Sequence, residues 1–532
     1  MDNKPTPVFR SWAPEWLIRS VILLVVVPSM ALFGLSTANG ASAAGYYGIE
    51  PADVQYSMVV FYAAVASFFA LERRFFSFIA VRQYLIISTL VQIITSYICY
   101  SAHNLHELFI FRFIQGMANC ASTSICITLI FNRLHNERAR EIGYSVFYCI
   151  LLMISPLTTL LTAPLLDAYD FNVLYKGIIF FYLPGTMLLF LIMNNVRLNR
   201  KFPLYQVDWA SFVIYALALC LIGYVLIYGQ QYYWLQDTRI AVSVVAIVLL
   251  LALHVVRQAK LKRPYLSLEV FKYKNYIIGA FLVFILYICR GALNITSAYF
   301  ASAMGLDPIH LGYILAANMV GILLGVIVSS RLTVMKKPMR LIWLYGFMLL
   351  LVFHLWMRFL FASQANPETY IIPLLIQGLG AGLLMTPLIL FMVSSVPASL
   401  GGTASATGVF FRFTGFCSSI ALINYFQLRE SSTHFNRFQQ ELSEANPLFL
   451  QRVTAYRQLL TSRGMAPDQA AHLAKGLLNR SVTAQAQLRY AMDYYYFISW
   501  ILVIVIFIIA LYPYVSRTVV NVRVNQPAPA SY

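Results

Sequence analysis

Long apolar segments constrain the fold of this 532-residue chain more than any other feature of its sequence. Hydrophobic residues make up 60% of the chain and charged residues only 11%, which is more apolar surface than a water-soluble domain can hide. A membrane-spanning helix needs about 20 mostly apolar residues. Fourteen segments have that character, at 18–40, 54–71, 79–101, 107–131, 143–166, 175–195, 209–228, 238–257, 276–300, 310–332, 340–361, 370–396, 404–426 and 491–515. The sequence therefore predicts an all-α polytopic membrane protein with 14 transmembrane helices, because barrel strands would be about 10 residues long with alternating polarity.

The placement of Lys and Arg orients these predicted spans. The chain holds 38 Lys and Arg against 20 Asp and Glu, a net charge of +18. If the N-terminus is cytoplasmic, 24 of the 38 fall in cytoplasmic segments and none in the six short loops on the other side. This asymmetry follows the positive-inside rule and predicts that both termini are cytoplasmic. The basic excess is expected to face anionic lipid rather than nucleic acid.

Three identical residues recur in two of the predicted spans. Ile-Gln-Gly stands at Ile114–Gly116 in span four and at Ile376–Gly378 in span twelve. If spans seven and eight are an insertion, span twelve takes the fourth place of a second six-helix half, so the expected order is 6+2+6. The predicted divisions are an N-terminal segment 1–17, a first bundle 18–200, two inserted helices with a linker 201–275, a second bundle 276–515 and a tail 516–532.

One long hydrophilic segment, 427–490, interrupts the second predicted bundle on its outer face. Asn446-Pro447 and Gly464 punctuate this segment. Apolar residues recur at helical spacing between these breaks and again after Pro467. The pattern predicts a helical hairpin outside the membrane, which serves either as a connector or as a docking surface for another protein.

Polar side chains occur inside several predicted spans, where they are costly unless they face a cavity or a neighbouring helix. Arg112, Gln115 and Asn119 are spaced i, i+3 and i+7, so they share one helix face. Two other spans carry arginine-bearing polar faces. We interpret these faces as the wall of a shared water-filled interior, with interhelical hydrogen bonding as the alternative for the amides. The candidates for this wall are Gln115, Asn119, Tyr287, Arg290, Asn294, Gln377 and Arg412. Because it would hold arginines and no mid-span acid, the interior is expected to favour anionic or neutral lipophilic compounds over cations.

None of the 20 acidic residues lies near the middle of a predicted span. A proton-coupled carrier needs a titratable group that meets both sides in turn, usually a carboxylate or a histidine. His354 in span eleven is one candidate, with a packed imidazole as the alternative. The sequence holds no GxxxxGK[ST] phosphate-binding loop and no clustered Ser, His and Asp for hydrolysis, and His103 and His106 are expected to be surface residues rather than zinc ligands. We therefore expect no enzyme, no cofactor and no metal site.

Four passages of the chain resemble one known family. They are LFIFRFIQGMANC (Leu108–Cys120), SPLTTLLTAPLLDAYDFNVLYKGIIFFYLPG (Ser155–Gly185), IQGLGAGLLMTPLILFMVSSVPASLGGTASATGVFFRFTG (Ile376–Gly415) and the loop with NPLFLQ and MAPDQAA. Together they are similar to the fourteen-helix drug:proton antiporters of the major facilitator superfamily, the membrane pumps of tripartite multidrug efflux systems. ALERRFF resembles a reduced form of this family's second-loop motif. The helix-one segment LFGLSTANG holds no acid, and Thr and Leu replace the expected glycines in ISPLTTLLTAP.

The resemblance implies a major facilitator fold and an inner-membrane efflux transporter of amphipathic, drug-like molecules that works by alternating access and proton antiport. It implies that Arg112 takes part in proton coupling or gating, and Glu107 and His354 are added as candidates for that role. The structural motif residues that it identifies are Glu72, Arg73, Gly116, Pro156 and Gly378. The implied partners are a small-molecule substrate, protons, membrane lipid, and a periplasmic adaptor and outer-membrane channel docked through 427–490. The alternatives are a specific exporter of an anionic metabolite or siderophore, or an uncoupled or transport-dead membrane scaffold.

Overall fold

The computed structural model is helical apart from one isolated β-bridge over the residues that it describes, which are 7–102, 104–133, 139–197, 207–443 and 446–511. Fourteen of these helices are long and apolar enough to cross a membrane, which confirms the fourteen predicted spans. Helices are the expected form, because backbone N–H and C=O groups in hydrocarbon must find partners within the protein.

Six spanning helices form each half of the molecule, and two more lie between the halves in the chain. The first half contains α1 (Glu15–Ala38), α3 (Pro51–Phe78), α4 (Val81–Ser101), α5 (Leu105–Arg133), α6 (Ala139–Ala168) and α7 (Val173–Ile192). The inserted helices are α8 (Trp209–Tyr228) and α9 (Thr238–Lys260). The second half contains α10 (Lys274–Ser302), α11 (Pro308–Val334), α12 (Met339–Leu360), α13 (Ile371–Ser394), α14 (Gly401–Tyr425) and α17 (Pro467–Leu511). This is the predicted 6+2+6 order.

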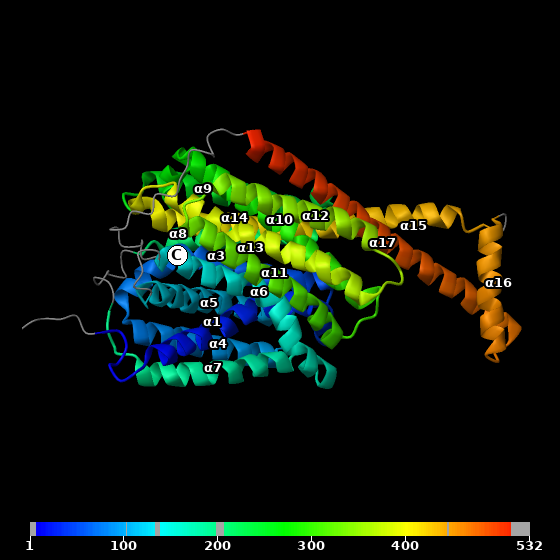
Figure 1. The fold of residues 1–532 in the computed structure, drawn as a ribbon, viewed down its shortest axis with the longest axis horizontal. Helices are drawn as coiled ribbons and strands as arrows, with labels where there is room; N and C mark the ends of the chain where they lie inside the picture. The colour runs from blue at the N-terminus through cyan, green and yellow to red at the C-terminus, as the bar shows by residue number, and fades with distance from the viewer. Residues whose placement is uncertain (1–6, 103, 134–138, 198–206, 444–445, 512–532) are drawn as a thin grey trace, which may run out of the picture.

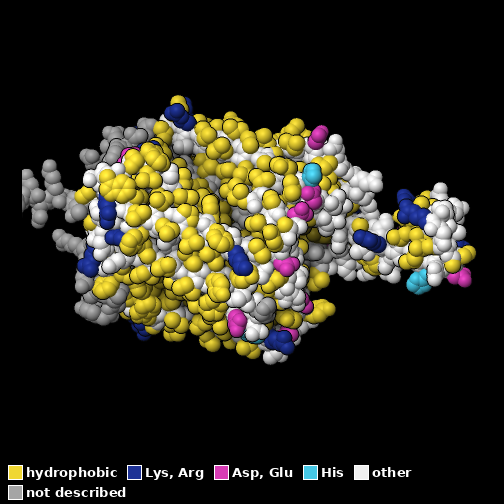
Figure 2. Space-filling model, turned by 90° about the horizontal axis from the view of Figure 1, so that it is seen from below, with side chains coloured by type: hydrophobic (Ala, Val, Ile, Leu, Met, Phe, Trp, Pro, Cys, Tyr) yellow, Lys and Arg dark blue, Asp and Glu magenta, His cyan; other side chains and the backbone are white. Residues whose placement is uncertain are grey.

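The two ends of the bundle differ in charge. We call the end where α1 begins the basic end, and the end from which residues 431–490 project the loop end. The spanning helices run between them in Figure 1, with the basic end on the left. Figure 2 shows hydrophobic side chains over the side of the bundle, with most Lys and Arg of the main body toward the basic end and most Asp and Glu toward the loop end. An apolar belt between charged ends suits a bundle that crosses a bilayer.

The Ile-Gln-Gly repeats occupy equivalent places in the two halves. Gly116 lies where α5 packs on α3, and an added Cβ would overlap the backbone carbonyl oxygen of Phe61. Gly378 lies where α13 packs on α11, and an added Cβ would overlap the carbonyl oxygen of Asn318. Both glycines therefore let two helix backbones approach closely, as small residues do in membrane helix pairs.

The two halves meet where α3 packs on α14 and where α6 packs on α11, and α6 also contacts α13. Near the loop end, Gln55 on α3 and Asn424 on α14 exchange side-chain hydrogen bonds of 2.8 and 3.3 Å. Gly312 brings α11 close to α6, because a Cβ there would lie 3.0 Å from the Cα of Leu160. These contacts join the two halves at the loop end.

The inserted pair of helices lies against the outside of this interface. Helix α8 packs on both α3 and α14, and the Tyr228 hydroxyl donates to Asp53 Oδ1 at 2.6 Å. An ion pair of 2.8 Å between Asp208 and Arg257 ties the start of α8 to the end of α9. Helix α9 is mostly exposed outside the bundle. Because its surface is apolar, the exposed side of α9 suits contact with lipid.

The predicted helical hairpin is present, but it is built differently from the expectation. Helix α14 continues through a π turn (Phe426–Glu430) into α15 (Ser431–Gln440), and α16 (Pro447–Ser462) follows. Helix α17 then runs unbroken for 45 residues, about 68 Å, which is about twice the thickness of a hydrocarbon core. No proline interrupts it after Pro467. Its first part projects beyond the bundle together with α15 and α16, and Leu460 of α16 packs there on Ala470 and Ala474 (Figure 1).

The structure describes part of the predicted N-terminal segment 1–17 and none of the predicted tail. Residues 7–14 precede α1 and lie against the end of α7, where Phe9 forms a bridge with Met193 and the Arg10 N–H donates to the Ile192 carbonyl at 2.9 Å. The first span begins at Glu15, inside the predicted N-terminal segment 1–17. The predicted tail 516–532 lies outside the described residues, as do His103 and the side chain of Arg73.

Candidate substrate cavity

A cavity of about 170 Å³ lies between the two halves of the bundle. Helices α1, α3, α5 and α6 of the first half and α10, α13 and α14 of the second half form its wall. The lining runs from Thr37, near the loop end of α1, to Tyr144 and Ser405, near the basic ends of α6 and α14. Since the halves are joined at the loop end, the cavity extends toward the basic end.

Aromatic side chains supply much of the apolar wall. Phe33 on α1, Tyr62 on α3 and Phe416 on α14 form a three-ring cluster, with centroid separations of 5.3, 5.6 and 5.6 Å. These separations are those of favourable aromatic pairs. The cluster joins the two halves, so a planar or amphipathic molecule in the cavity would meet rings from both.

Two arginines from the second half reach across the cavity to α6 of the first half. Arg290 Nη2 donates to the Leu152 carbonyl at 2.7 Å, and Arg412 Nη1 donates to the Tyr148 hydroxyl at 3.3 Å. The Arg412 guanidinium also lies 5.6 Å from the centre of the Tyr148 ring. No Asp or Glu is among the described lining residues. Neutral acceptors therefore hold both cations, and their charge is not compensated within the wall.

The carbonyl that Arg290 binds is free because of a proline one turn along α6. In a regular helix the N–H of residue 156 would donate to the carbonyl of Leu152, but Pro156 has no N–H. Arg290 Nη2 supplies the missing donor. Pro156 was predicted to be a structural motif residue. In this structure it leaves the Leu152 carbonyl available to Arg290.

The structure places five predicted cavity residues on this wall: Asn119, Tyr287, Arg290, Asn294 and Arg412. Asn119 also donates from Nδ2 to the Ser29 carbonyl on α1, so it links α5 to α1 as well as facing the cavity. Asn294 lines the cavity with an exposed side chain. Whether these side chains contact a substrate stays a prediction.

The two glutamines lie elsewhere, which corrects the expectation that they line the cavity. Gln115 donates from Nε2 to Ser96 Oγ on α4 at 3.0 Å, and Gln377 accepts from Asn318 Nδ2 on α11. Each amide therefore bonds a neighbouring helix within its own half, which is the alternative left open above. Gln377 and Gly378 both contact α11, whereas Gln115 bonds α4 and its neighbour Gly116 packs on α3.

Arg112 is fully buried inside the first half. Its Nη1 donates to the Leu32 carbonyl at 3.1 Å and to Gln115 Oε1 at 2.8 Å, and its guanidinium lies 4.6 Å from the centre of the Phe61 ring. Its Nε and Nη2 have no hydrogen-bond partner among the described residues. Phe61 also lines the cavity, so one ring contacts both the buried cation and the cavity. Glu107 is exposed at the loop end of α5 and forms no ion pair with Arg112 in the described part of the chain.

The remaining candidates lie away from the cavity wall. His354 is buried in α12, where Nδ1 is 2.7 Å from the Leu350 carbonyl and the Tyr495 ring centre is 5.2 Å away. Glu72 is buried near the basic end of α3 and accepts from Ser124 Oγ at 2.8 Å. Ser124 lines the cavity, so Glu72 is one contact removed from it.

Comparison with a family model decides the identity of the fold. The model described as Major Facilitator Superfamily matches residues 21–421, well over half of the chain. The chain belongs to the major facilitator superfamily. This membership agrees with the two six-helix halves and with a cavity between them, and it makes the chain a membrane transporter rather than an enzyme.

Distant relatives within this superfamily are named as drug exporters. The chain is 23% identical over 373 residues to "Multidrug export protein EmrB" of Haemophilus influenzae, covering 68% of this chain and 71% of the relative. It is 22% identical over 454 residues to "Probable multidrug resistance protein EmrY" of Escherichia coli, covering 84% and 87%. A solved POT family transporter in complex with 5-aminolevulinic acid has a TM-score of 0.62 at 12% identity, covering 96% of this chain and 99% of that one, and shows the fold alone.

Sequence reasoning missed the aromatic wall of this major facilitator cavity. Phe33, Tyr62 and Phe416 belong to apolar spans, and an aromatic ring facing a cavity looks the same in sequence as one facing lipid. One signal was available on α6, where Tyr144 and Tyr148 are spaced i, i+4 and therefore share a helix face.

Proposed function

We propose that this chain is a secondary active exporter that moves amphipathic small molecules out of the cell by alternating access, in exchange for protons. The observation that carries the proposal is the cavity at the interface of the halves, with an aromatic cluster and two arginines. Rings supply apolar contact area with little specificity, and a cavity that both halves line is where alternating access binds its substrate. The distant relatives named as multidrug exporters support the same proposal.

The charge of the cavity sets the proposed substrate class. Arg290 and Arg412 face it, and no described lining residue is acidic. At a separation of about 4 Å, a guanidinium attracts an anion and repels a cation by about 1 kcal/mol in water and by about 4 kcal/mol at an effective dielectric constant of about 20. The proposed substrates are therefore anionic or neutral lipophilic compounds. The same two arginines favour a second candidate function, a specific exporter of one anionic metabolite or siderophore.

The proposed orientation puts the basic end in the cytoplasm of an inner membrane. The positive-inside rule supports it, because 24 of the 38 Lys and Arg fall in segments on that side. With this orientation the cavity extends toward the cytoplasm, from which a substrate would load. The loop 427–490 would then project into the periplasm, where we propose that it docks an adaptor protein and, through it, an outer-membrane channel.

The proposed exchange for protons needs a group that links proton movement to the cavity. Arg112 is the leading residue for it, because a buried cation with two unpaired nitrogens beside the cavity would respond to protonation or substrate nearby. Glu107 and His354 stay predictions, since neither contacts Arg112 or the cavity wall in the described structure.

The proposal is tested by transport in proteoliposomes of the purified protein. Three lipophilic dyes of similar size, one anionic, one neutral and one cationic, are followed across the membrane with protein-free liposomes as the control. We expect protein-dependent movement of the anionic and neutral dyes and little of the cationic dye. Failure of all three dyes to move would contradict a broad exporter, and a preference for the cation would contradict the substrate class. If only one anionic compound of a larger panel moves, the second candidate function holds instead.

A further inference from the structure

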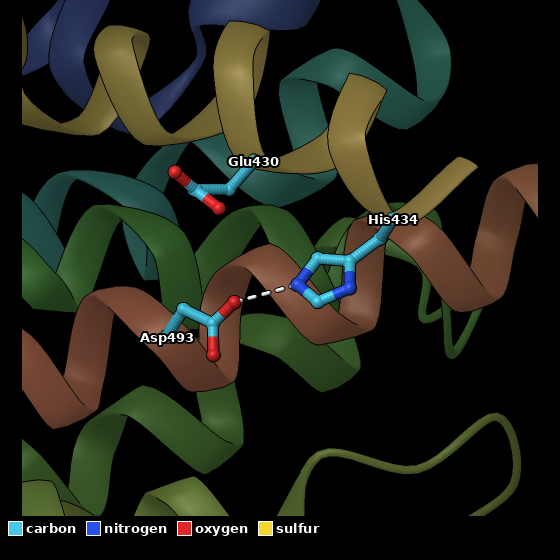
Figure 3. A group of neighbouring side chains, drawn as sticks. All are labelled: Glu430, His434 and Asp493. Atoms are coloured by element: carbon cyan, nitrogen blue, oxygen red, sulfur yellow. Dashed lines mark hydrogen bonds and ion pairs between the residues drawn. The ribbon is translucent and has the colours of Figure 1, made fainter. Parts of the chain in front are cut away.

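Three side chains with metal-binding chemistry meet where the projecting segment leaves the bundle, away from the cavity. Glu430 is the last residue of the π turn, His434 lies in α15, and Asp493 lies on α17. Their ligand atoms all lie within 4.8 Å of one another. Figure 3 shows the three side chains directed into one space between the two helical segments.

The local sequence explains why this cluster forms. Glu430 and His434 are spaced i, i+4, so a helix presents both on one face. The path of the chain is helical through this spacing, because the π turn runs directly into α15. Helix α15 packs along α17, which brings Asp493 opposite that face. π turns inside helices are frequent at functional sites, since they redirect the side chains that they carry.

The donor set matches a divalent transition metal. One imidazole nitrogen and two carboxylates are ligands that Zn²⁺ takes, with water completing the coordination of a partly exposed site. The cluster is partly buried, because the His434 side chain is 17% exposed and the Asp493 side chain is 43% exposed. Within the cluster, Asp493 Oδ2 lies 2.6 Å from His434 Nε2. Among the described residues, no Lys or Arg forms an ion pair with Glu430 or Asp493, so a bound cation would supply a direct positive partner.

We propose that Glu430, His434 and Asp493 bind one divalent transition-metal ion, with Zn²⁺ as the best match. The ion fastens α15 to α17 at the base of the projecting segment. Because α15 continues from α14, which carries Arg412 of the cavity wall, the same ion ties this cavity helix to the last spanning helix. The inference does not depend on the proposed transport function.

The test measures metal binding to the full-length purified protein after treatment with a chelator. Zn²⁺ is added, unbound metal is removed by desalting, and the bound zinc is measured by elemental analysis together with the midpoint of thermal unfolding. We expect about one Zn²⁺ per chain, a higher unfolding midpoint with Zn²⁺, and no such rise with Mg²⁺. His434→Gln and Asp493→Asn should weaken binding at least about tenfold.

A matched control is present at the same end of the molecule. His310 and Asp307 form an exposed pair at the start of α11, without a third ligand among the described residues. His310→Gln should leave zinc binding unchanged. Glu430→Gln keeps the pair of His434 with Asp493 intact and should still lose zinc, so it separates metal binding from loss of that pair. Binding by Glu430→Gln or His434→Gln equal to that of the unmodified protein, or no zinc retained by the unmodified protein, would overturn the proposal.

Discussion

At the residue scale, the contact between Arg290 and α6 connects a helix-breaking residue to the charge of the cavity. Pro156 leaves the Leu152 carbonyl without an intrahelical donor, and Arg290 Nη2 binds it at 2.7 Å. This contact fixes where the positive charge lies in the wall. Two variants therefore test the same interaction from opposite sides.

Replacing the arginine removes the charge itself. We expect Arg290→Leu to reduce transport of anionic compounds selectively, by about five- to thirtyfold, which corresponds to about 1–2 kcal/mol of lost attraction. Arg290→Lys is the control, because it keeps the charge while losing the planar donor group. The measurement is the ratio of initial transport rates for an anionic and a neutral dye. An equal loss for both dyes, or no loss for either, is inconsistent with a charge-selective role.

Replacing the proline gives the Leu152 carbonyl a donor within α6 and leaves the charge of Arg290 in place. In Pro156→Ala, the new N–H at position 156 can bind the Leu152 carbonyl within α6, so it competes with Arg290 for this acceptor. We expect the anionic-to-neutral ratio to fall by less than in Arg290→Leu, because the charge is still present. Pro164→Ala in the same helix is the matched control and should leave the ratio unchanged. The same ratio in all three proteins would show that Pro156 does not position Arg290.

The sequence predicted which charged side chains face the interior, but it did not predict which helix each polar side chain bonds. Arg290 and Arg412 are costly in hydrocarbon, so their placement toward an interior followed from their charge. Gln115 and Gln377 are neutral amides, for which a neighbouring helix is as good a partner as a cavity. Helical spacing gives the face of a residue, but it does not identify the element that this face meets.

At the scale of elements, both halves contain the same kind of close helix contact, between α5 and α3 in the first half and between α13 and α11 in the second. Each rests on a glycine next to a glutamine that bonds within its own half. The recurrence of Ile-Gln-Gly therefore reflects helix packing rather than a pair of substrate contacts. The helix-pair geometry could be anticipated from the repeat, whereas the bonding partners Ser96 and Asn318 carry no comparable sequence signal.

The close helix contacts at Gly116 and Gly378 predict that a larger residue at either position destabilises the protein. Gly116→Ala and Gly378→Ala each introduce a Cβ that overlaps a backbone carbonyl oxygen, so the helices must separate. We expect each to cost about 1–3 kcal/mol of stability and to lower the unfolding midpoint of the purified protein. Gly476→Ala is the control, because a Cβ at that position in α17 meets nothing within 4 Å. If all three variants unfold at the same temperature, the close approach does not limit stability.

At the scale of the whole molecule, the halves are joined at the loop end and the cavity extends toward the basic end. The reciprocal hydrogen bonds of Gln55 and Asn424 connect α3 with α14 at the joined end. The proposed alternating access requires this end to open when the other closes. The pair is therefore placed where the two conformations must differ.

Joining this pair covalently should arrest transport. In Gln55→Cys with Asn424→Cys, a short bifunctional thiol reagent is expected to hold the loop end closed and to abolish dye transport, because the opposite conformation becomes inaccessible. Each single cysteine variant treated with the same reagent is the control for the native cysteines and should keep its activity. Undiminished transport by the crosslinked double variant would mean that the two halves do not separate here.

The global fold could be predicted because it follows from a strong and redundant signal. Fourteen apolar segments leave little freedom in the number of spans. The unbroken length of α17 and the cluster of Glu430, His434 and Asp493 could not be predicted in this way. The cluster needs a contact between α15 and α17 that no local pattern encodes, although the spacing of Glu430 and His434 was visible.

The most direct test of the proposed exchange is the internal pH of proteoliposomes that contain the purified protein. Anionic, neutral and cationic lipophilic compounds are added in turn, and a trapped pH-sensitive dye reports proton movement while tracer uptake is followed in parallel. The proposal predicts proton movement triggered by the anionic and neutral compounds, and its loss on addition of a protonophore. Tracer movement without any proton movement, or proton movement triggered chiefly by cations, would contradict it.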